Sequence, residues 1–153
     1  MRIGEICTRE VVYCTRATAV AEAAQLMRNN HVGDLIVVDQ RDGCLFPVGI
    51  VTDRDLVLEV LAENVDPATV KAGDVMGPDL ATVRDTDVVY DAIATMRSKG
   101  IRRLPVVDAR GCLVGVLTAD DVAEFLAEEL SGIARVAPRQ LQVEEKRRAP
   151  VRS

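Results

Sequence analysis

Two stretches of this chain carry the same pattern of apolar and polar positions. Residues 19–30 place apolar side chains three and four positions apart, the spacing of one helix face, and residues 88–99 repeat that spacing. Each stretch is followed by a short β-branched run, at 35–38 or 104–107, and then by an acidic residue, a glycine-containing turn and a second apolar run. The pattern therefore predicts a helix followed by two strands in each half.

The two halves are copies of one another. A second helix is predicted at the end of each, over residues 53–63 and 119–130, and a link containing Pro67 joins them. Aligning residue n with residue n+69 matches the halves without a gap from Glu5 to Asp39, after which the first copy has three extra residues in its turn. Two copies are too few for a solenoid, so they predict two half-domains that share a core around a pseudo-twofold axis.

Two motifs carry a family resemblance. The segments VGDLIVVD … VGIVTDRDL and IRRLPVVD … VGVLTADDV resemble tandem CBS domains, the paired form often called a Bateman module, and the resemblance covers roughly residues 1–130. It implies an α/β fold of two CBS repeats, each β-α-β-β-α, at residues 1–65 and 66–131. Residues 132–153 remain as a charged tail, for which disorder is one interpretation.

The resemblance also implies a function. Paired CBS domains act as sensors that bind an adenine nucleotide, here AMP or ATP first, with NAD and S-adenosylmethionine as further members of the same ligand class. About twenty residues lie outside the repeats, so we expect the output to pass through dimerisation or through a downstream protein that the sequence does not name. No cofactor is required beyond the regulatory nucleotide.

A repeated Gly-x-x-Thr-x-x-Asp pattern supplies the candidate ligand residues. It ends at Asp55 in the first copy and at Asp121 in the second. From the residues alone, a capping box is as good an interpretation as a ligand site, because Thr is followed three positions later by an acid at a helix start. The family resemblance implies that Asp55 and Asp121 accept hydrogen bonds from ribose hydroxyls, and that Thr52 and Thr118 contact phosphate.

Phosphate also needs a cation, because a nearby carboxylate repels it. The resemblance implies Arg103 first and Arg102 second, since a basic residue before the apolar strand often reaches phosphate in the family. The first copy has Gly33 and Asp34 at the equivalent positions. Either the two sites differ in affinity and in the charge of their ligand, or Arg54 replaces the missing cation at the first site. The adenine is expected against apolar positions near the first strand and the turn before the second, namely Cys14, Val32, Leu35, Val83, Ile101 and Leu104.

Charge separates the body from the tail. Up to residue 131 the chain has 13 basic and 22 acidic side chains, a balance of −9, whereas residues 132–153 have six basic and two acidic ones. An acidic body argues against general binding to phosphate backbones. We therefore do not expect nucleic acid as a partner, and a nucleic-acid-associated regulator that uses the basic tail stays as an alternative.

Catalysis and metal binding have little support. The chain has a single histidine, no glycine-rich phosphate loop, no nucleophile elbow and no Cys-x-x-Cys pair. We therefore expect a protein that is not an enzyme, with no catalytic residue and no metal site. The cysteines are expected to be free thiols that pack in the interior; they are Cys7, Cys14, Cys44 and Cys112.

Location and assembly complete the expectations. No apolar run approaches the roughly 20 residues of a membrane helix, and the amino terminus lacks the apolar core of a signal peptide, so a cytoplasmic protein is expected. The apolar faces of the second helices exceed what one copy covers, which predicts a homodimer. A structural dimerisation module with degenerate ligand sites is the alternative. The predicted dimer residues are Leu56, Val57, Val60, Leu61, Val122, Phe125, Leu126 and Leu130.

Overall fold

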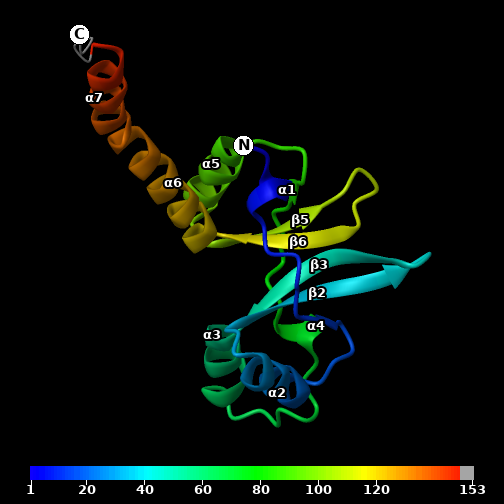
Figure 1. Cartoon of the computed structure of the whole chain (residues 1–153). Helices are drawn as coiled ribbons and strands as arrows, with labels where there is room; N and C mark the ends of the chain where they lie inside the picture. Colours follow the sequence, from blue (N-terminus) through cyan, green and yellow to red (C-terminus); the bar gives the residue numbers. More distant parts are fainter. Residues whose placement is uncertain (149–153) are drawn as a thin grey trace.

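The computed structural model describes residues 1–148, which form two three-stranded sheets (Figure 1). In each sheet the first strand runs parallel to the middle strand, and the third strand returns antiparallel to it. One sheet has the order β1-β2-β3 and the other β4-β5-β6. The strands are β1 (Tyr13–Thr15), β2 (Asp34–Arg41), β3 (Cys44–Thr52), β4 (Val83–Arg84), β5 (Arg103–Val107) and β6 (Leu113–Thr118).

Helices cover the sheets at the positions that the apolar spacing predicts. The crossover helices are α2 (Val20–Asn30) and α5 (Val89–Lys99). The second helix of the first copy is α3 (Asp53–Leu56), continued by the π-helical turn η1 (Val57–Leu61), and that of the second copy is α6 (Ala119–Ala134). Strands β3 and β6 contact one another between the two halves. The predicted α/β fold of two repeats is confirmed.

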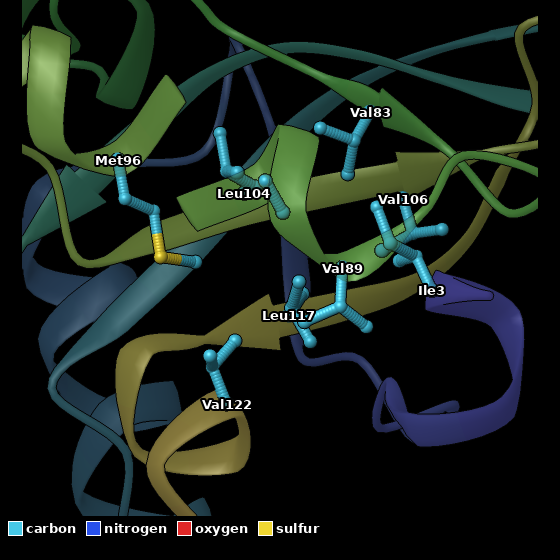
Figure 2. Packing of buried hydrophobic residues seen from close by; sticks show 9 residues of the cluster. Ile3, Val83, Val89, Met96, Leu104, Val106, Leu117 and Val122 are labelled. Atoms are coloured by element: carbon cyan, nitrogen blue, oxygen red, sulfur yellow. The ribbon is translucent and has the colours of Figure 1, made fainter. Parts of the chain in front are cut away.

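A short helix lies near the start of each repeat and packs on the sheet of the other repeat. The first, α1 (Ile3–Ile6), belongs by sequence to the first copy but packs on the second sheet, where Ile3 is fully buried (Figure 2). The backbone N–H of Ile3 donates to the carbonyl of Asp87 at 2.9 Å. Its counterpart α4 (Ala72–Val75) packs on the first sheet, and the N–H of Ala72 donates to the carbonyl of Thr18 at 2.8 Å. Each half is thus completed by the other half's leading segment.

This exchange explains the glycine of the repeated motif. A Cβ on Gly49 would lie 2.5 Å from Sδ of Met76, which follows α4. A Cβ on Gly115 would lie 2.8 Å from Sγ of Cys7 and 2.9 Å from the carbonyl oxygen of Thr8, which follow α1. Because the crossing segments approach the strands this closely, both motif positions accept only glycine without a shift of the neighbouring chain.

The expectation that the cysteines are free thiols is wrong for two of them. Cys44 and Cys112 form a disulfide that joins the turn regions of the two sheets. The repeat register could not show this, because it is interrupted in these turns by the three extra residues of the first copy. Cys7 and Cys14 are free thiols. Burial raises the pKa of Cys14 to about 11, so this thiol is uncharged at neutral pH.

The region after residue 131 is helical as far as the structure describes it. Helix α6 continues to Ala134, and α7 (Val136–Arg147) follows after Arg135. Figure 1 shows α6 and α7 together extending away from the sheets. Residues 149–153 of the predicted charged tail lie outside the described part of the chain. None of the helices between residues 1 and 148 combines the length and apolar character of a membrane span.

Candidate functional site

The Thr and Asp of both motifs form capping boxes. In the first copy, the N–H of Asp55 donates to Oγ1 of Thr52 at 3.1 Å, and the N–H of Thr52 donates to Oδ2 of Asp55 at 2.9 Å. Thr118 and Asp121 repeat this arrangement at 3.1 and 2.8 Å. The capping-box interpretation of the motif is therefore confirmed in both copies.

Capping leaves both side chains able to bind a ligand. Each box uses Oδ2 of its aspartate, so Oδ1 of Asp55 can still accept from a hydroxyl group. The Thr52 hydroxyl accepts from a backbone N–H, and its own proton can still be donated to an acceptor such as a phosphate oxygen. Both residues are partly buried. Cap and ligand contact are thus compatible roles for the same pair.

Thr52 and Asp55 line a cavity of about 630 Å³. This volume lies within the range of roughly 300–1,000 Å³ that small-molecule sites occupy. The cavity is built from both copies, because its lining includes residues of each repeat. Its lining is Gly33, Asp34, Ile50, Thr52, Asp53, Arg54, Asp55, Gly77, Asp79, Leu80, Ala81, Gly100, Ile101, Arg102 and Arg103.

All three predicted cations reach this cavity. Arg54 comes from α3, two residues after Thr52, whereas Arg103 begins β5 in the other repeat and Arg102 immediately precedes it. The alternatives drawn from the sequence, that the first site lacks a cation or that Arg54 replaces it, both treat each site as the product of one copy. The structure instead adds the arginines of the second repeat to the motif of the first.

Arg103 is already engaged by Asp34, its equivalent in the repeat register. Nε of Arg103 lies 2.5 Å from Oδ2 of Asp34, and the Asp34 side chain is 13% exposed against 40% for Arg103. Both residues begin the middle strand of their sheet, so the pseudo-twofold axis brings equivalent positions together. Oδ2 of Asp34 makes no geometrically good hydrogen bond within the described residues. The contact is therefore an ion pair with poor hydrogen-bond geometry.

Burial is the dominant influence on Asp34. Its removal from water raises the pKa of the carboxyl, the charge and hydrogen bonding of Arg103 oppose that rise, and the carboxylate of Asp53 adds to it. A ligand phosphate that approached Arg103 would compete with this partly desolvated carboxylate. The cavity thus holds its strongest candidate phosphate ligand in a pair that a bound anion would have to share or break.

The helix amino terminus offers little to a phosphate. The N–H of Asp53 donates to the carbonyl of Gly33 at 2.9 Å, and the N–H of Arg54 donates to Oδ1 of Asp53 at 2.8 Å. With the N–H of Asp55 committed to Thr52, the first turn has its donors satisfied. An anion in this cavity therefore depends on the Thr52 hydroxyl and on the arginine side chains.

The remaining cations differ in availability. Arg102 forms an exposed ion pair with Asp120, with Nη2 and Oδ1 3.0 Å apart. Exposed pairs of this kind contribute little stability, so Arg102 can leave Asp120 at small cost. Arg54 is exposed and lies next to the motif. Both side chains are free to reorient toward a ligand.

The predicted adenine residues fall into two groups. Ile101 lines the cavity, and Val32 lies partly buried in the first repeat. The side chains of the other four are buried in the two cores, which leaves them little surface to offer a ligand; they are Cys14, Leu35, Val83 and Leu104.

Sequence reasoning missed the segment before β4. Gly77, Asp79, Leu80 and Ala81 line the cavity, with Ile50 of β3 facing the same space. The prediction named the turn before each middle strand and positions in or next to the first strand, but not this segment. The signal was available, because apolar residues precede the first strand in both copies.

The second motif lies on the other side of the pseudo-twofold axis. Thr118 pairs with Arg103 across β5 and β6, as Thr52 pairs with Asp34 across β2 and β3. By the repeat register, Gly33 and Asp34 stand toward Thr118 where Arg102 and Arg103 stand toward Thr52. The second site is therefore the poorer in cations of the two. Within residues 1–148, no three His, Cys, Asp or Glu side chains gather in a metal-binding group.

Comparison with known proteins agrees with the duplicated fold. The family model described as CBS domain matches residues 3–62 and again residues 72–128. The CBS domain-containing protein YhcV of Bacillus subtilis is 34% identical over 133 residues, covering 86% of this chain and 91% of that protein. An uncharacterized protein of Methanopyrus kandleri is 36% identical over 122 residues, and there the match covers 80% of this chain but 61% of the relative.

A solved structure of an archaeal relative contains a nucleotide. CBS domain protein PAE2072 from Pyrobaculum aerophilum, complexed with AMP, superposes with a TM-score of 0.70 at 31% identity. The superposition covers 79% of this chain and 89% of that one.

Proposed function

The chain belongs to the CBS-domain family, and from this membership we propose that it is a regulatory module that binds an adenine nucleotide in the cavity beside Thr52 and Asp55. One observation carries the proposal: the cavity combines a hydroxyl donor, a carboxylate with a free oxygen and three arginines drawn from both repeats. The AMP complex of a relative at 31% identity supports the same ligand class.

Each group has a chemical role in this proposal. Oδ1 of Asp55 accepts hydrogen bonds from the ribose hydroxyls, and Thr52 donates its proton to a phosphate oxygen. Arg103, with Arg102 and Arg54, neutralises the phosphate charge. The apolar side chains of Ile50, Leu80, Ala81 and Ile101 provide the surface against which the adenine lies.

The candidate adenosyl ligands differ in charge. Four carboxylates line the cavity beside the three arginines. The arginines favour AMP and ATP, because the phosphates of these ligands are negatively charged. The carboxylates favour S-adenosylmethionine, which carries a positive charge. NAD carries two linked phosphate groups. We propose AMP or ATP, because Thr52, Arg54, Arg102 and Arg103 supply more phosphate-binding groups than a ligand without phosphate can use.

Signalling in this proposal runs through assembly. The groove along α2, α3 and η1 is lined by Leu56, Val57, Val60 and Leu61, and the groove along α5 and α6 includes Val122 and Leu126. These grooves contain six of the eight predicted homodimer residues; Phe125 and Leu130 lie outside them, and Val60 and Val122 are buried within the chain. In the proposal, a downstream protein reads the nucleotide state of the dimer. No catalytic role is proposed. A cytoplasmic location is also a proposal, and it must accommodate the Cys44–Cys112 bond, since disulfides are uncommon in reducing compartments.

The test begins with protein purified without added nucleotide. Mass spectrometry of ligand released on denaturation, followed by calorimetric titration with AMP, ATP, NAD and S-adenosylmethionine, identifies the ligand. We expect an adenine nucleotide to raise the melting temperature with concentration, because a ligand of the folded state stabilises it by RT ln(1 + [L]/Kd). A melting temperature unchanged by all four compounds at millimolar concentration would contradict the proposal.

A second candidate rests on the ion pair. Because Asp34 already neutralises Arg103, a structural dimerisation module with a degenerate site is the alternative function. It predicts a stable homodimer with no released nucleotide and no ligand-dependent melting. Mass spectrometry of released ligand and ligand-dependent melting therefore separate the two candidate functions.

A further inference from the structure

The arm formed by the end of α6 and by α7 carries an apolar stripe. Its members Leu130, Ile133 and Leu141 are 67%, 70% and 61% exposed, and an apolar surface that is contiguous rather than scattered marks an interaction site. Leu126 begins the stripe at the body, and Leu126 and Leu141 lie about two helical turns on either side of Ile133. Figure 1 shows this arm standing clear of both sheets, so the body does not cover the stripe.

Charge is divided sharply along the same arm. Helix α6 contains acidic side chains and no Lys, Arg or His; they are Asp120, Asp121, Glu124, Glu128 and Glu129. The segment from Arg135 to Arg148 is mainly basic, with Arg135, Arg139, Lys146, Arg147 and Arg148 against Glu144 and Glu145. Glu144 already pairs with Arg148 in its own helix, at 3.9 Å. The arm therefore has an acidic half next to the body and a basic half at its end.

We propose that the apolar stripe of the α6–α7 arm binds the arm of a second copy in antiparallel orientation. An antiparallel pair centred on Ile133 sets Leu126 of one copy near Leu141 of the other and places each acidic half beside the partner's basic half. A parallel pair would set acid against acid and base against base, which repels. Complementary charge thus selects both the occupant and its direction.

This surface differs from the homodimer faces of the proposed function. Those faces lie on the bodies, along α2, η1, α5 and the start of α6, and meet the arm at Leu126. Leu130 was predicted as part of the dimer face but lies outside both grooves, and the arm contact continues through it to Leu141. A chain can use both, in which case the arms connect body dimers into larger assemblies. The two contacts are therefore tested separately, and neither test depends on a nucleotide.

The direct test is a zero-length carbodiimide crosslink, which joins a carboxylate to an amine in contact. The chain has three lysines, Lys71, Lys99 and Lys146. Within one arm, Lys146 lies about 27 Å along the helix from Glu128, at 1.5 Å per residue. Asp120, Asp121 and Glu124 lie farther still from Lys146 within one arm, so a crosslink from Lys146 to one of them forms only between two chains. An antiparallel pair centred on Ile133 sets Lys146 opposite residue 120, beside these carboxylates. We expect that crosslinked peptide in the mass spectrum of the full chain; its absence, with Lys146 joined only to Glu144 or Glu145, would overturn the proposal.

Matched variants give a second readout by sedimentation velocity. In a background with Val57→Glu and Leu61→Glu, which disables the body face, we expect the arm alone to maintain a dimer. Adding Leu130→Glu and Ile133→Glu should convert that dimer to a folded monomer, with an unchanged circular dichroism spectrum because both side chains are exposed. A background protein that is already monomeric, or one whose mass is unaffected by the arm substitutions, would overturn the proposal.

Charge reversal tests the pairing rule. In the same Val57→Glu, Leu61→Glu background, Glu128→Lys with Glu129→Lys makes an arm that repels itself, and so does Arg135→Glu with Arg139→Glu. Mixed together, the two variants present opposite charges to one another, so we expect a mixed dimer that neither forms alone. If the mixture remains monomeric, complementary charge does not drive the contact. If the arm instead sediments with vesicles of phosphatidylserine and stays monomeric in solution, a membrane surface covers the stripe and the proposal fails.

Discussion

The two repeats share a backbone plan but differ at the position where they meet. Both motifs end their third strand in a Thr–Asp capping box with nearly equal distances. Both middle strands begin at equivalent residues, which are Asp34 in the first repeat and Arg103 in the second. Duplication preserved what the helix start requires and allowed divergence where a ligand would bind. The two copies therefore keep the same capping motif beside neighbours of opposite charge, an acid in the first and a base in the second.

The largest expected effect concerns the disulfide that joins the two repeats. Replacing Cys44 and Cys112 with Ser removes a crosslink between positions 68 residues apart, which costs about 4 kcal/mol in the chain-entropy model. Urea unfolding of wild-type and variant proteins measures the loss. Reductant should destabilise the wild type by the same amount and leave the double variant unchanged. Equal midpoints for all four samples would show that the repeats do not need the bond.

A smaller effect concerns the Asp34–Arg103 pair. Arg103→Ala should weaken AMP binding about tenfold, since a hydrogen bond to a charged group contributes roughly 1.5–3 kcal/mol and the existing ion pair offsets part of it. Adenosine, which lacks the phosphate, should bind both proteins equally. Asp34→Asn should act in the opposite direction, because it releases Arg103 for the ligand. Calorimetry that finds AMP and adenosine weakened alike would place phosphate recognition elsewhere, with Arg54 as the next candidate.

The smallest effect separates the two crossover helices. Helix α2 ends at His31 with φ 54°, and α5 ends at the equivalent Gly100 with φ 65°. A side chain in this left-handed conformation is strained, so His31→Gly should stabilise the protein by up to about 1 kcal/mol. Gly100→Ala should destabilise it by a similar amount, although a Cβ there meets no neighbour within 4 Å. Thermal melts of both variants measure the difference, and shifts of the same sign would contradict it.

Local pattern predicted most of the fold. The spacing of Val20, Ala23 and Met27 predicted α2 to within a residue, and the Thr–Asp spacing correctly predicted the capping boxes. The exchange of α1 and α4 was not predictable from spacing, because it depends on contacts between distant segments such as Ile3 and Val89. The spacing of apolar residues shows which face of a helix is apolar, but it does not show which repeat covers that face.

The site was predicted in its parts but not in its assembly. Thr52, Asp55, Arg54, Arg102 and Arg103 were all named, yet they were divided between two sites. The structure gathers them in one cavity because the second repeat packs against the first motif. Symmetry could have indicated this, since equivalent residues near a twofold axis contact one another. Of the adenine candidates, Cys14, Leu35, Val83 and Leu104 lie in the two cores, because apolar residues beside a strand also pack against the sheet.

One measurement tests the central claim that the cavity beside Asp55 is the nucleotide site. Asp55→Ala and Asp121→Ala each remove the same capping contact, at a cost of about 1 kcal/mol, so their melting temperatures should fall equally. AMP titrated into both variants by calorimetry then reports the ligand contact alone. The account predicts that Asp55→Ala weakens the tightest binding event at least tenfold while Asp121→Ala leaves it nearly unchanged. Equal affinities in the two variants, or a loss confined to Asp121→Ala, would contradict it.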